Sequence, residues 1–335
     1  MIQQAIPRPP VLVVARASVG FLLQCVRAVT RHVDGDILGG ITVLALLQGT
    51  YAHISQSAER PRGDAVRPVS VQSLARSLRT PPETMRRCVA RLIALGWCER
   101  VSTKGVVIAD SAAARAQIDL FLAEMRAAFF GMLSDLKRID FDFDIMGQAA
   151  AQKESEPLDV SNDLPADGRS DAGNAYRALA MDRAMVDFGL RIVDGGTPAL
   201  GHDYTIGCVF CAILSANASP FAFDPQNAWR YGTRDSLAPD EVRRPVPLSE
   251  ISQMLGVPYE TVRRYVNALI ACGDVVRDER KGLLVPSHLL NSPRLITASM
   301  EIARRFVEMT GELKRLGFDF HTLDARAAPD AGIRG

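Results

Sequence analysis

The chain has 335 residues, of which 47% are hydrophobic and 23% are charged, and its formal net charge is +1. This composition supplies apolar material for two cores of ordinary domain size and argues against a chain that coats nucleic acid through bulk charge. The six cysteines lack the paired spacing of a secreted disulfide framework, no signal-peptide pattern is present, and the apolar run 37–47 is too short to cross a bilayer. We therefore expect a globular cytoplasmic protein.

The sequence contains one segment twice. RPVSVQSLARSLRTPPETMRRCVARLIALGWCER, which begins at Arg67, aligns without a gap with RPVPLSEISQMLGVPYETVRRYVNALIACGDVVR, which begins at Arg244. This offset of 177 residues holds through LKRIDFDF and LKRLGFDF, and an offset of 167 residues relates the earlier segments. The repeat predicts a first copy (residues 1–146), a flexible acidic linker (147–174) and a second copy (175–335) with a ten-residue insertion between about 215 and 243.

Hydrophobic periodicity predicts the same opening elements in both copies. An amphipathic helix comes first, and a short, almost entirely apolar helix follows it, which should be buried centrally. Polar connections containing Pro and Gly come next. The predicted helices are 11–33 and 37–48 in the first copy and 178–193 and 204–215 in the second, with connections at 49–66 and 216–243.

A short helix and a sharp break then lead to a basic-faced helix in each copy. In the first copy the break contains Thr80, Pro81, Pro82 and Glu83, which predict a capping box with proline at the first helical position. The second copy keeps the proline and the glutamate but has Val257 in place of the hydroxyl cap. The short helices are predicted at 71–78 and 248–255, and Gly96 and Gly273 should end the basic-faced helices.

A basic hairpin and a long helix complete each copy. The hairpin strands are predicted at 98–101 and 106–108, and again at 275–278 and 283–285. The long helices, 113–139 and 291–316, each precede an F-D-F sequence. Helices of this length beyond a small domain need a partner, so we expect either an intramolecular pseudo-dimer of the two copies or a homodimer.

This order of helices, tight turn, basic-faced helix and hairpin resembles the winged helix-turn-helix of bacterial transcriptional regulators. PETMRRCVARLIALG and YETVRRYVNALIACG resemble the recognition helix of GntR-type and MarR-type repressors. The resemblance implies a mainly α fold with two tandem winged helix-turn-helix domains, each a three-helix core with a two-stranded β wing and long flanking helices. It also implies binding of double-stranded DNA. The chain departs from both types, because MarR-type proteins carry one copy per chain and GntR-type proteins append a ligand-binding domain.

Basic side chains gather on the predicted recognition helices and wings. Segment 67–104 carries eight Arg and Lys residues against two Glu, whereas 244–281 is close to neutral. A helix of this kind fits the major groove, the wing reaches phosphates, and asparagine can read adenine. The candidate DNA contacts are Thr84, Arg86, Arg87, Arg91, Arg100 and Lys104 in the first copy, and Tyr259, Thr261, Arg263, Arg264, Asn267, Arg277, Arg280 and Lys281 in the second.

Other functions have less support in the sequence. No catalytic or metal-binding motif is present, so we expect no enzyme activity, cofactor or metal. Cys208 and Cys211 form a C-x-x-C inside an apolar run, which favours core packing over a redox or metal role. We expect a nucleoid-associated DNA-binding transcriptional regulator. A tandem winged-helix interaction subunit of the chromosome-condensation type and a redox-responsive regulator remain as alternatives.

Overall fold

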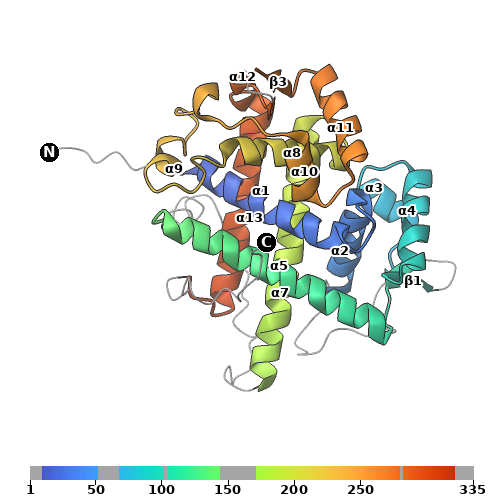
Figure 1. Ribbon diagram of the computed structural model, residues 1–335. Coiled ribbons are helices and arrows are strands. Elements are labelled where there is room, and N and C mark those ends of the chain that lie inside the picture. The colour runs from blue at the N-terminus through green and yellow to red at the C-terminus, as the bar shows by residue number, and fades with distance from the viewer. Residues whose placement is uncertain (1–9, 52–67, 102–104, 144–170, 280–281, 321–335) are drawn as a thin grey trace.

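The computed structural model describes residues 10–51, 68–101, 105–143, 171–279 and 282–320, and it is mainly helical, as predicted (Figure 1). The two copies have the same order of principal elements. The first copy contains α1 (Val11–Thr30), α2 (Ile37–Tyr51), α3 (Val71–Ser77), α4 (Pro82–Ala94), β1 (Cys98–Val101), β2 (Gly105–Ile108) and α5 (Ala112–Arg138). The second contains α7 (Asp171–Leu200), α8 (Tyr204–Ala218), α9 (Asn227–Arg230), α10 (Leu248–Leu255), α11 (Tyr259–Ala271), β3 (Val276–Asp278), β4 (Gly282–Leu284), α12 (Ser287–Leu290) and α13 (Pro293–Arg315).

Each hairpin is an antiparallel pair, with β1 against β2 and β3 against β4. In both copies a single residue ahead of the short helix adds a bridge to the second hairpin strand. Val69 pairs with Val106 in the first copy, and Val246 pairs with Leu283 in the second. The repeat therefore extends from sequence to strand register.

Left-handed backbone turns also recur at equivalent positions. The second copy places glycine at these turns, whereas the first copy uses larger residues with the same sign of φ. The pairs are Asp34 (φ 53°) with Gly201 (69°), Arg79 (46°) with Gly256 (64°), and Asp140 (54°) with Gly317 (81°). Glycine adopts this conformation without steric cost and aspartate tolerates it, so the strain relative to the second copy is greatest at Arg79.

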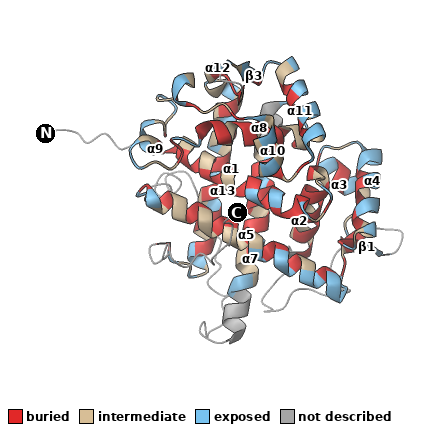
Figure 2. Ribbon diagram, in the orientation of Figure 1, coloured by how far each residue is buried: buried red, intermediate tan, exposed pale blue. Residues whose placement is uncertain are grey.

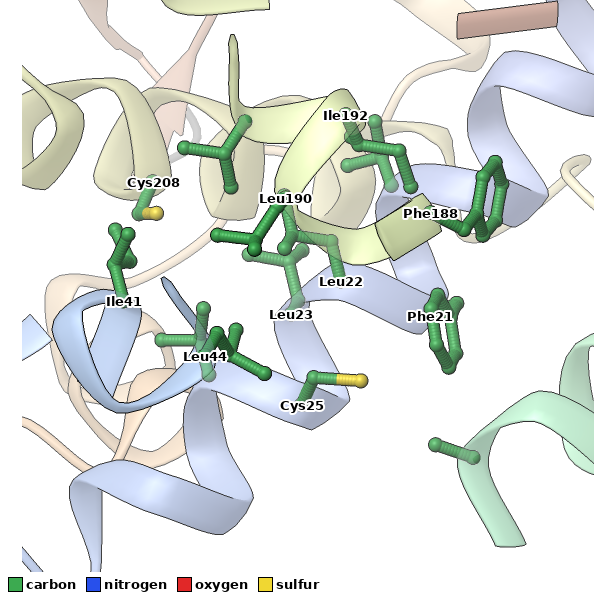
Figure 3. Close-up of a cluster of buried hydrophobic side chains, with 14 of the residues drawn as sticks. Phe21, Leu22, Leu23, Cys25, Ile41, Leu44, Phe188, Leu190, Ile192 and Cys208 are labelled. Atoms are coloured by element: carbon green, nitrogen blue, oxygen red, sulfur yellow. The ribbon is translucent and has the colours of Figure 1, made fainter. Parts of the chain in front are cut away.

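The buried side chains of both copies form one continuous core rather than the two separate cores that composition suggested. Helix α1 packs on α5 in its own copy and on α7, α8, α10 and α13 of the other. Equivalent residues meet where the copies join. Phe21 stacks on Phe188 with ring centroids 5.7 Å apart (Figure 3). Phe143 stacks on Phe320 with ring centroids 5.2 Å apart. Contacts between equivalent residues indicate a pseudo-two-fold axis through the core.

Three predictions made from the sequence about helix ends and connections are wrong. Thr80 does not cap α4, because two consecutive prolines start the helix at Pro82 and leave Pro81 as the N-cap; the Thr80 hydroxyl donates to the Leu78 carbonyl instead. Helix α7 begins at Asp171, inside the predicted linker 147–174, and residues 147–170 of that linker lie outside the described residues. The connection 216–243 is not only a polar loop, because α8 continues to Ala218 and α9 follows.

The insertion in the second copy packs against the first copy. The guanidinium of Arg16 on α1 donates to the carbonyls of Ala228 (3.2 Å) and Tyr231 (2.9 Å) and lies over the Phe221 ring at 5.2 Å. Burial lowers the pKa of Arg16 to about 10. The Trp229 indole donates to the Ile139 carbonyl at 2.7 Å. The extra residues therefore join the two copies from outside the shared core.

Helix α1 is long and apolar enough, by length and composition alone, to cross a membrane. The expectation from the sequence considered only the shorter apolar run 37–47, which is too short to cross a bilayer. In the folded chain 67% of its apolar window is buried against other helices. The apolar character of α1 therefore serves the core that both copies share.

Candidate nucleic-acid interface

Helices α4 and α11 lie on the same side of the molecule and turn exposed faces outward (Figures 1 and 2). Their inward faces are apolar at helical spacing, as predicted. Gly96 (φ 78°) and Gly273 (φ 81°) follow the two helices in left-handed turns. The buried residues are Met85, Cys88, Val89 and Leu92 on α4 and Val262, Val266 and Leu269 on α11.

The arginine pairs at the start of both helices are exposed and lie beside a glutamate of the same helix. Arg86 donates two hydrogen bonds to Glu83, at 2.8 and 2.7 Å, and these bonds lower the pKa of the Glu83 carboxyl. In the second copy Arg263 pairs with Glu260 at 2.7 Å. Exposed pairs of this kind contribute little to stability. A phosphate could therefore displace the glutamate at small cost.

A cleft of about 600 Å³ separates the two helices. It lies on the pseudo-two-fold axis, because equivalent residues of the two copies line it: Asp36 with Asp203, and Cys88 with Tyr265. The basic side chains in the cleft all come from the first copy. They are Arg79, Arg87 and Arg91.

Arg91 has a role that the sequence did not reveal. Its guanidinium pairs with Asp36 at 2.8 Å and donates to the Val33 carbonyl at 2.9 Å. Both acceptors belong to the junction of α1 and α2, so Arg91 ties α4 to that junction. The second copy has Ala268 at the equivalent position, so this tie exists in the first copy alone.

Arg79 was missed as a candidate contact, although it lies in the turn between α3 and α4 and lines the cleft. Its side chain is 57% exposed, and its nearest charged neighbour, Asp194, is 3.8 Å away. The alignment itself contained the missing signal. The repeat places Gly256 at the same point, which marks Arg79 as a cation kept in a strained backbone conformation.

The remaining candidates differ in exposure. Tyr259 is 47% exposed, Thr84 and Asn267 are exposed, and Thr261 is half-buried. Arg100 and Arg277 are exposed on their hairpins, and Arg264 lies over the neighbouring Tyr265 ring. Lys104, Arg280 and Lys281 lie outside the described residues.

Cys208 and Cys211 both face the interior from α8. Burial raises the pKa of both thiols, that of Cys211 to about 12. A protonated, buried thiol reacts slowly with oxidants. The geometry therefore favours core packing for this pair.

Comparisons with protein-family models, with curated proteins and with solved structures gave no match for this chain. The features that bear on function are therefore the cleft, the two helices beside it and their charges. We name the cleft with α4 and α11 the basic face.

Proposed function

We propose that the chain is a sequence-specific double-stranded DNA-binding transcriptional regulator built from two tandem winged helix-turn-helix units. One observation carries the proposal: exposed arginine pairs occupy the same positions on α4 and α11, and these helices flank one cleft. The element order α2, bridge residue, α3, α4 and hairpin, which recurs from α8 to β4, supports this proposal, because a winged helix-turn-helix requires a helix, a turn, a second helix and a hairpin in that order.

The basic face offers both kinds of contact that DNA recognition requires. Arg86, Arg87 and Arg263 can exchange their glutamate partners for phosphates, which accept the same kind of charge-assisted hydrogen bond from a guanidinium. Asn267 is exposed on α11, and its side-chain amide offers a donor and an acceptor that complement those of adenine in the major groove. Phosphate contacts would orient the protein, and Asn267 would contribute sequence preference.

Rigid packing of the copies constrains the DNA site. Because α4 and α11 border the same cleft within one core, the linker does not set their separation. In separated dimers the half-sites lie one helical turn apart, about 34 Å. We expect adjacent contacts on a compact site instead.

The test is the binding of purified full-length protein to duplex genomic fragments over a range of salt concentrations. About six phosphate contacts predict a slope near −5 for log K against log[salt]. Absence of binding at low salt would contradict the proposal and favour an interaction subunit that binds protein.

A further inference from the structure

Three potential metal ligands from separate segments converge at the end of α11. His202 lies in the turn between α7 and α8, Cys272 is the C-cap of α11, and Asp274 follows two residues later. Their donor atoms all lie within 4.8 Å of one another. We propose that His202, Cys272 and Asp274 form a zinc-binding site.

The distances are close to those of a zinc centre. Cys272 Sγ lies 3.9 Å from His202 Nε2 and 3.6 Å from Asp274 Oδ2. Tetrahedral zinc with ordinary ligand bond lengths requires about 3.6 Å between sulfur and nitrogen and about 3.4 Å between nitrogen and oxygen. His202 Nε2 and Asp274 Oδ2 are now 2.7 Å apart, in a hydrogen bond. Binding needs this pair to open by roughly 0.7 Å.

The arrangement does not suit a cysteine nucleophile. In a Cys-His-Asp triad the histidine uses one ring nitrogen for the thiol and the other for the carboxylate. Here Nε2 of His202 faces both Cys272 and Asp274. Convergence of sulfur, oxygen and one nitrogen on a single point is the pattern of a metal site.

The surroundings leave the site ready for a cation. Arg294, at the start of α13, is paired with Asp274 through Oδ1, which leaves Oδ2 directed at His202. An outer-shell partner of this kind orients a ligating carboxylate. Cys272 is exposed, so zinc could reach the site, and water could complete its coordination.

The first copy shows that the fold does not need these polar residues. Gly35, Leu95 and Trp97 stand at the positions of His202, Cys272 and Asp274. Trp97 is fully buried and packs edge-on against Phe121 with ring centroids 6.4 Å apart. The equivalent positions therefore lack zinc-binding side chains in the first copy and carry three potential zinc ligands in the second.

Equilibrium dialysis of the full-length chain against Zn²⁺, followed by metal analysis, tests the site. We expect one zinc per chain, with at least tenfold weaker binding in Cys272→Ser and in His202→Gln. Cys211→Ser is the matched control, since that half-buried thiol lies on α8 and is not one of the three proposed ligands, and it should bind zinc as the wild type does.

Cobalt supplies a second readout. The wild type and Cys211→Ser should show a thiolate-to-cobalt charge-transfer band that Cys272→Ser lacks. Equal zinc binding by the wild type, Cys272→Ser and His202→Gln, or no binding by any of them, would overturn the proposal and leave the cluster an ion pair. Neither measurement involves DNA, so failure here is separate from failure of the proposed function.

Discussion

Single residues distinguish the two copies most clearly where their backbones are the same. Arg79 and Gly256 occupy equivalent left-handed turns, the first ahead of α4 and the second ahead of α11. A non-glycine residue in this conformation costs on the order of 1 kcal/mol. The first copy therefore retains a cation on the basic face at a cost that the second copy avoids.

Replacing Arg79 should separate stability from binding. We expect Arg79→Gly to raise the free energy of unfolding by about 1 kcal/mol, because strain is relieved, and to weaken DNA binding, because a cation leaves the cleft. Urea denaturation and mobility shift measure the two effects. The reverse change, Gly256→Arg, should destabilise the protein, since a Cβ there would lie 2.9 Å from Thr30 Oγ1. A less stable Arg79→Gly variant would contradict the strain argument.

Asn217 should matter far more to stability than its equivalent, Thr50. The Asn217 amide donates to the carbonyls of Arg244 (2.8 Å) and Leu283 (2.9 Å), and its oxygen accepts from Val285 N–H (3.0 Å). The Thr50 hydroxyl donates to the Leu46 carbonyl of its own helix at 3.0 Å.

Replacing Asn217 with alanine removes the side-chain partner of three backbone groups in and beside the second hairpin. Asn217→Ala should lower the free energy of unfolding by about 3 kcal/mol, and Thr50→Ala by about 1 kcal/mol or less. Chemical denaturation of both variants measures the difference. Equal losses would show that the amide does not hold the hairpin to α8.

At the scale of elements, α4 and α11 should contribute unequally to the proposed DNA binding. All three arginines of the cleft belong to the first copy. Arg86→Ala with Arg87→Ala should therefore weaken DNA binding more than Arg263→Ala with Arg264→Ala does. The affinity of the α4 variant should fall at least about tenfold below that of the wild type, since each lost contact is worth about 1–3 kcal/mol.

A pair of adjacent arginines elsewhere provides the control for this comparison. Arg304 and Arg305 lie on α13 beside Glu301 and Glu308. Arg304→Ala with Arg305→Ala removes the same charge and should change DNA affinity much less. Equal losses from the α4, α11 and α13 pairs would show that net charge alone drives binding.

The elements with strong hydrophobic periodicity could be predicted from sequence, and their ends could not always be. The apolar faces of α4 and α11 follow directly from spacing, as do their terminal glycines. The start of α4 could not be predicted from spacing, because backbone restriction by Pro81 and Pro82 outweighed the preference of Thr80 for capping. The role of Arg91 depends on Asp36, which lies 55 residues earlier, so only the tertiary fold brings them together.

At the scale of the whole molecule, duplication has joined two equivalent units into one body. Helix α1 of the first copy packs on α8, α10 and α13 of the second, and Phe21 meets its own equivalent, Phe188. Helices α4 and α11, which differ in sequence, are thereby fixed in one relative orientation. At two equivalent exposed positions, α4 has Pro82 and Ala90, whereas α11 has Tyr259 and Asn267. The two helices should therefore prefer different bases.

Selection of bound duplexes from a randomised pool tests the DNA-binding proposal most directly. The wild-type chain should enrich a compact, non-palindromic motif, with an adenine preference that Asn267→Ala removes. The variant in which Arg86, Arg87, Arg263 and Arg264 are all changed to alanine should enrich none. Failure of the wild type to enrich any sequence over this variant would contradict the account, and a palindromic motif would contradict joint reading by α4 and α11.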